Sequence, residues 1–141
     1  MKTRIAHVGA FKRFSSNDVR RITVALHWLV THKIELGKPV HDIINLHYGR
    51  DFLRETLEYD IVIIHSVFSH YFPAKSNDAG TSEMHDMPHW IDRLLSTKAK
   101  VIFLFSDQPN SLSDGHIGKL TGYQKVESPE EDLAIYERKI Q

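Results

Sequence analysis

Histidine is the residue type in this sequence that most directly suggests chemistry. The chain contains ten histidines, and His65 directly follows the apolar run Ile61-Val62-Ile63-Ile64. At the end of a strand, a histidine serves either as an acid or base near neutral pH or as a hydrogen-bond cap for the backbone. We predict that His65 is the catalytic candidate, and we interpret the nearby His70 as a cap.

A second polar group follows the first apolar run, which ends at Gly9; residues 12–16 read Lys-Arg-Phe-Ser-Ser. A helix that begins there offers backbone N–H groups to a phosphate or carboxylate. The alternative interpretation is a capped helix with a basic surface turn. Because G-x-G-x-x-G and G-x-x-x-x-G-K-[ST] are both absent, a nucleotide held by a P-loop is excluded.

The spacing of His85 and His89 is that of two metal ligands on one helix face. Pro88 and a helix cap at Asp86 place His85 before the helix, however, so this geometry is broken. We therefore predict no metal site. A serine–histidine–aspartate triad is not supported either, because the G-x-S-x-G turn that exposes a serine nucleophile is absent.

The elements that must position these side chains alternate between two patterns. Short β-branched runs indicate buried strands, and apolar residues three and four apart after an N-cap indicate helices. The predicted strands cover residues 5–9, 42–47, 60–65, 101–105, 123–127 and 133–137. The first predicted helix follows the cap Ser15–Asp18 and ends at Gly37, and the others cover residues 49–57, 86–97 and 116–120.

This alternation predicts an α/β fold, a Rossmann-like doubly wound and mostly parallel sheet with a C-terminal antiparallel hairpin, in one domain over residues 1–141. In such sheets a ligand binds outside the carboxyl ends of the strands. That rule selects a set of strand-end residues as candidates for cofactor binding: Gly9, Ala10, Phe11, His47, Tyr48 and Ser66, beside His65.

Composition limits the classes of partner. Eighteen basic and eighteen acidic residues give a net charge of zero, which argues against duplex nucleic acid as a partner. No run reaches the roughly 18 apolar residues of a membrane span, and cysteine is absent. We expect a cytoplasmic protein with no membrane partner; a small-molecule ligand and a protein partner or homo-oligomer both stay open.

The region Tyr59–Ile140 resembles the second half of class I S-adenosylmethionine-dependent methyltransferases. The resemblance lies in Tyr59-Asp60-Ile61-Val62-Ile63-Ile64-His65-Ser66, in the run Val101–Phe105, in Gly122-Tyr123-Gln124-Lys125-Val126 and in the closing strand from Leu133. It implies S-adenosylmethionine, or a related nucleoside-type ligand, as the cofactor. In that family the turn after the first strand and the end of the second strand contact the cofactor, and these positions are Gly9-Ala10-Phe11 and His47-Tyr48 here.

Two alternatives remain from the sequence. Only one glycine is left of the family's glycine-rich turn, which favours a non-catalytic binding or assembly module. In addition, Arg4–Ala10 and Asp60–Ser66 resemble the N-terminal half of GT-B glycosyltransferases. That second resemblance implies a subunit that acts with another chain.

Overall fold

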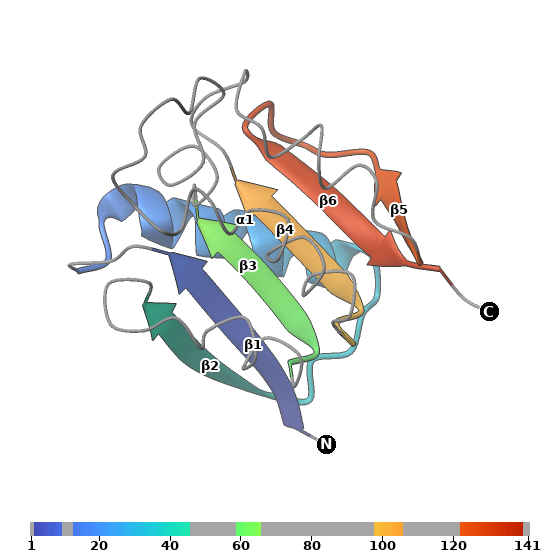
Figure 1. Ribbon diagram of the computed structural model, residues 1–141, viewed down its shortest axis with the longest axis horizontal. Coiled ribbons are helices and arrows are strands. Elements are labelled where there is room, and N and C mark those ends of the chain that lie inside the picture. The colour runs from blue at the N-terminus through green and yellow to red at the C-terminus, as the bar shows by residue number, and fades with distance from the viewer. Residues whose placement is uncertain (1, 10–12, 46–58, 66–97, 106–121, 140–141) are drawn as a thin grey trace, which may run out of the picture.

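The structure is a computed structural model, and it describes residues 2–9, 13–45, 59–65, 98–105 and 122–139. This part of the chain forms one six-stranded sheet with one helix packed on it (Figure 1). The elements in chain order are β1 (Lys2–Gly9), α1 (Ser16–Thr31), β2 (Lys38–Asn45), β3 (Ile61–His65), β4 (Val101–Phe105), β5 (Tyr123–Val126) and β6 (Leu133–Arg138).

The sheet is mixed, with the strand order β2-β1-β3-β4-β6-β5. Strands β2, β1, β3 and β4 run parallel, whereas β6 is antiparallel to both β4 and β5. The β3 and β4 segments are buried on both faces, as the continuous apolar runs of central parallel strands require. All six strands overlap the segments in which the sequence predicts strands, although β1 and β2 begin earlier than predicted, at Lys2 and Lys38.

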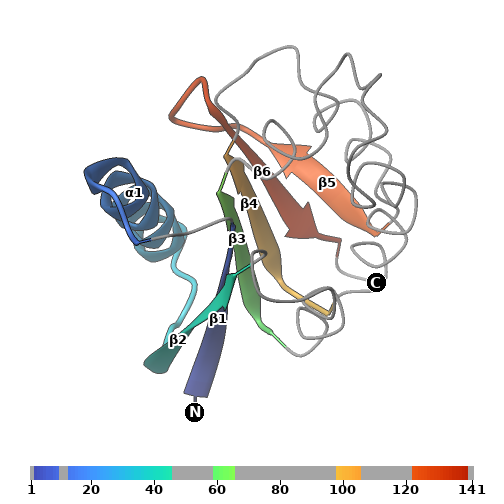
Figure 2. The same ribbon diagram turned by 60° about the vertical axis from the view of Figure 1, so that its left-hand side comes forward.

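The predicted doubly wound Rossmann-like α/β fold is nevertheless wrong. Strands make up 49% and helix 22% of the described residues, which hold one helix on a six-stranded mixed sheet. A doubly wound sheet needs helices on both faces, whereas α1 lies against one face (Figure 2). The three further predicted helices, at 49–57, 86–97 and 116–120, lie outside the described residues.

The core between α1 and the sheet is formed by alternate residues of the strands. Ile5, Ile63 and Phe103 face α1 and pack against Trp28 and Leu29, and all five side chains are buried. Side chains two residues apart on a strand point to the same face. His7, two residues after Ile5, and His65, two residues after Ile63, therefore also face α1. Burial of this core therefore holds the start of α1 over the ends of β1 and β3.

The start of α1 is set by a capping box. The Ser15 hydroxyl oxygen accepts a hydrogen bond from the Asp18 backbone N–H (3.2 Å), and the Asp18 carboxylate accepts one from the Ser15 N–H (2.9 Å). These reciprocal bonds satisfy donors that a helix N-terminus leaves open. They also fix the Asp18 side chain against the first turn.

We expect Ser15→Ala to lower the free energy of unfolding by about 1 kcal/mol, the usual value of an N-cap side chain. The measurement is urea unfolding followed by circular dichroism. Ser16→Ala is the matched control, because Ser16 is an exposed first-turn residue and its loss leaves the cap intact. Equal effects of the two substitutions would contradict the assigned cap.

The end of α1 differs from the prediction. The helix ends at Thr31 rather than near Gly37, and Lys33 adopts φ 60° in the left-handed region. The Lys33 N–H donates to the Val30 carbonyl and the Ile34 N–H to the Leu29 carbonyl, each at 3.0 Å. This is a Schellman motif, in which the apolar residue after the turn packs back on the helix. Ile34 accordingly contacts the core, which explains why it continues the apolar pattern.

Candidate functional site

The parallel strands end in one row across the sheet. Gly9 of β1 is in register with Asn45 of β2 and with His65 of β3, and His65 is in register with Phe105 of β4. The chain order of the strands reverses between β1 and β3, because β2 lies on one side of β1 and β3 on the other. In open sheets with parallel strands such a reversal is where ligands bind. We call this row the carboxyl edge.

The first turn of α1 places a charged pair beside His65. The Asp18 Oδ1 atom lies 3.3 Å from His65 Nδ1 and 3.6 Å from Arg21 Nη1. The Arg21 guanidinium lies 5.7 Å from the centre of the Phe105 ring. All four side chains are buried, so the imidazole is enclosed between an ion pair and an aromatic ring.

Two more histidines extend this group along β1 and β2. His7 Nε2 lies 2.8 Å from His41 Nδ1, within hydrogen-bond distance, and the two rings are stacked. The His7 ring centre is 5.9 Å from that of His65, and Phe14 stands edge-on to His7 at 6.2 Å. His7 and His65 are buried, whereas His41 is exposed. The cluster thus reaches from the interior to the surface.

Burial makes both inner histidines weak bases. It lowers the pKa of His65 to about 4, an effect that Arg21 adds to and Asp18 opposes. Burial also lowers the pKa of His7 to about 4, helped by His65 and His41. At pH 7 both imidazoles are therefore neutral. His65 can accept or donate a hydrogen bond in that form, but it holds no extra proton to give as a general acid.

Asp18 remains a carboxylate throughout the physiological range. Burial raises the pKa of this group, but the hydrogen bonds from Ser15, together with His65 and Arg21, lower the pKa below its usual value. Asp18 and Arg21 then carry opposite charges, and the two neutral imidazoles add none. The inner part of the site offers no excess positive charge to an anion.

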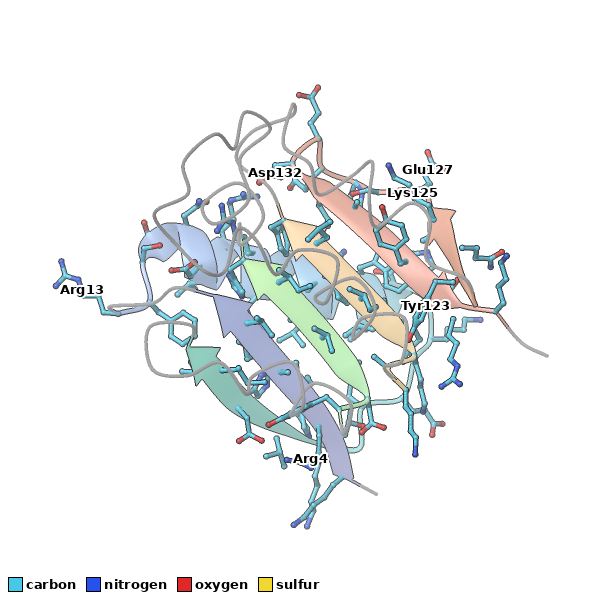
Figure 3. All side chains as sticks on the ribbon, in the orientation of Figure 1. Arg4, Arg13, Tyr123, Lys125, Glu127 and Asp132 are labelled. Atoms are coloured by element: carbon cyan, nitrogen blue, oxygen red, sulfur yellow. The ribbon has the colours of Figure 1, made fainter. Side chains whose placement is uncertain are left out.

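The predicted anion site at the start of α1 is occupied by the chain itself. The Asp18 carboxylate takes the position in which a phosphate would meet the first turn, and Ser15 is used as the cap. Arg13 is exposed and extends away from the sheet (Figure 3). The arrangement matches the capped helix with a basic surface turn, the second of the two interpretations of this segment.

The structure brings together two of the predicted site residues, Gly9 and His65, which are register partners at the carboxyl edge. The other predicted residues lie outside the described part of the chain: Ala10, Phe11, His47, Tyr48 and Ser66.

Sequence reasoning missed four members of the cluster: His7, His41, Asp18 as a partner of His65, and Arg21. The usable signal was the position of His7 inside an apolar run, where an imidazole is buried among β-branched neighbours. The other three gave no signal of their own, since Asp18 was assigned only as a cap.

A second polar cluster links the amino half of β1, the middle of β2 and the segment before β3. The Asp42 carboxylate accepts a hydrogen bond from the Tyr59 hydroxyl at 2.9 Å and pairs with Arg4 at 3.5 Å. The Arg4 guanidinium lies over the Tyr59 ring, 4.6 Å from its centre, and Figure 3 shows Arg4 at the amino end of β1. These contacts tie β1 and β2 to the residues before β3.

Within the described ranges, no three His, Cys, Asp or Glu side chains are grouped so that they could hold a metal ion. No helix in the same ranges is long and apolar enough to cross a membrane. Comparison of the sequence with models of protein families finds no match, and comparison with curated proteins finds no significant match.

Proposed function

We propose that this chain is a methyltransferase-like domain that binds a small nucleoside-type ligand at the carboxyl edge, with S-adenosylmethionine as the first candidate. The observation that carries the proposal is the register of Gly9 with His65 where the strand order reverses. A glycine at a strand end permits close approach of a ligand to the backbone, and His65 provides a polar group beside it.

The electrostatics of the cluster favour this ligand class over a phosphorylated one. A phosphate would meet the Asp18 carboxylate and find Arg21 already paired with it. A sulfonium cation carries the opposite charge, and the neutral imidazoles of His7 and His65 do not repel it. In methyl transfer the cofactor supplies the reactive group, and the protein supplies binding and orientation. The weak basicity of His65 is therefore compatible with this role.

Titration calorimetry with S-adenosylmethionine and its product S-adenosylhomocysteine tests the proposal. For the wild-type chain we expect heat of binding at millimolar or lower ligand concentration. For Gly9→Val we expect the affinity to fall by about tenfold or more, which corresponds to about 1.4 kcal/mol. The valine side chain would lie on the α1 side of β1, beside His65.

Thr3→Val is the matched control, since it places the same side chain at the amino end of the same strand. Circular dichroism verifies that both variants fold. Absence of heat with both ligands in the folded wild-type protein would overturn the proposal. If light scattering shows a stable oligomer and neither ligand gives heat of binding, the results favour the alternative of a non-catalytic assembly module.

A further inference from the structure

One side of α1 carries a row of apolar residues that the fold leaves largely uncovered. Val19 is 55% and Val30 is 66% exposed, and Ile22 and Leu26 between them are only partly buried. Successive members of this row are three or four residues apart, so all four lie on one face of the helix. We call these four residues the α1 stripe. A contiguous apolar surface of this kind marks a contact site for another molecule.

The other two sides of α1 are already engaged within the chain. Trp28 and Leu29 point into the core between the helix and the sheet. On the next side, Arg20 pairs with Asp132 of the turn between β5 and β6 at 2.9 Å. Leu26 touches the core only at the inner border of the stripe. Among the described residues, the stripe is therefore the side of α1 that is apolar and still open to a partner.

The stripe is nearly symmetric about its middle. Val19 lies three residues before Ile22, and Val30 lies four residues after Leu26. Two copies of α1 packed antiparallel would therefore place Val19 of each copy against Val30 of the other, and Ile22 against Leu26. A two-fold dimer interface needs this property, because the same surface serves on both chains. Antiparallel packing also sets the opposite ends of the two helix dipoles side by side.

The charges that flank α1 complement each other in the same arrangement. Arg13 precedes the helix, is exposed and extends away from the sheet (Figure 3). Glu35 follows the end of the helix and is also exposed. In an antiparallel pair the start of one helix meets the end of the other, so Arg13 of each copy approaches Glu35 of the other copy. A parallel pair would set Arg13 against Arg13, and like charges repel.

We propose that the α1 stripe is the interface of a symmetric dimer, in which α1 packs antiparallel against α1 of a second copy of this chain. One pair of helix faces makes a small interface, so the dimer is weak and dissociates on dilution. None of the four stripe residues belongs to the cluster around His65. Dimerisation therefore needs no ligand at the carboxyl edge, and failure of either proposal leaves the other intact.

Sedimentation velocity of the full chain between about 10 μM and about 1 mM tests the dimer. We expect the mean mass to rise with concentration from that of one chain toward that of two. Val19→Glu and Val30→Lys should each weaken dimerisation by about tenfold or more, because each sets a charge against an apolar side chain. Thr31→Lys is the matched control, because Thr31 is an exposed residue of α1 outside the stripe. Circular dichroism verifies that all three variants fold.

An equimolar mixture of Val19→Glu and Val30→Lys tests the antiparallel order. In a mixed antiparallel pair the two substituted positions face each other with opposite charges, while the remaining two valines pack together at the other end. We expect the mixture to recover the dimer that neither variant forms alone.

Three results would overturn the proposal: a wild-type chain that stays single up to about 1 mM, a mixture that stays single, or a Thr31→Lys variant that dissociates as readily as Val30→Lys. A single chain that instead sediments with phosphatidylserine vesicles would assign the stripe to a membrane surface, and the dimer would again be wrong.

Discussion

Lowering the pH from 7 to 5 is expected to destabilise the fold by about 2 kcal/mol for each of the two buried histidines. In the folded chain the pKa of His7 and that of His65 are both about 4, whereas in the unfolded chain they return to about 6.5. Between these values the unfolded state binds protons that the folded state rejects. The stabilisation is complete above pH 6.5 and is lost as the pH falls toward 4.

Titration of Asp18 does not contribute to the change in stability between pH 7 and pH 5. The pKa of its carboxyl is lowered in the folded state, so its contribution is lost only as the pH falls from the usual aspartate pKa of about 3.9 toward the lower folded value, which is below pH 5. Urea unfolding at pH 7 and pH 5 measures the effect. In His65→Gln the change in unfolding free energy between the two pH values should shrink by about 2 kcal/mol.

His27→Gln is the matched control, because His27 is an exposed histidine of α1 and should leave the pH dependence as it is. An equally steep loss of stability in His65→Gln and in the wild-type chain would show that His65 is not a buried neutral imidazole. The described burial of His65 beside Asp18 and Arg21 would then be wrong.

Removing the Phe103 ring is expected to lower the free energy of unfolding by about 3–5 kcal/mol, as deletion of a buried aromatic ring does. Phe103 lies in the middle of β4, is fully buried and meets the edge of Trp28. Phe103→Ala would leave a cavity between α1 and the sheet. The same packing positions Asp18 over His65, so we expect the loosened helix to weaken the pH effect described above as well.

Val30→Ala is the matched control for this substitution. Val30 lies on α1 but is 66% exposed, so its truncation should change the unfolding free energy by less than about 0.5 kcal/mol. Urea unfolding at pH 7 compares the two variants. Similar small effects in both would contradict the assignment of Phe103 to the core beneath α1.

The strands of the described region were predictable from the sequence because their signal is local. The run Ile61–Ile64 and the run Val101–Phe105 are apolar at every position, which only strands buried on both faces need. The position of β6 between β4 and β5 has no such signal, because pairing joins residues far apart in the chain. The fold class depends on which faces of the sheet are covered by helices. Within the described residues α1 covers one face, so the predicted doubly wound fold was wrong.

The end of α1 shows why a correct pattern can mislead. Ile34 and Leu36 continue the apolar spacing of the helix, yet both contact the core from beyond its end. The helix stops because Lys33 turns into the left-handed region, a conformation for which glycine is the usual sequence signal. Gly37 does have positive φ, but it lies in the connection to β2.

The candidate site was predictable only as far as strand ends determine it. Gly9 and His65 follow from the rule that parallel strands end at a common edge. The pairing of Asp18 with His65 depends on how α1 crosses the sheet, and that crossing is set by Trp28 and Leu29 in the core. A cap residue and a charge partner look identical in the sequence, so the second role of Asp18 emerges only from the structure.

The most direct test of the central claim is the map of backbone amide shifts when S-adenosylhomocysteine is added to the ¹⁵N-labelled chain. Binding at the carboxyl edge predicts that the largest shifts fall on Gly9, His65 and the first turn of α1. The amides at the amino ends of the same strands, Thr3, Ile61 and Val101, should stay in place. Shifts gathered at those amino ends, or no shifts at saturating ligand, would contradict a ligand site between β1 and β3.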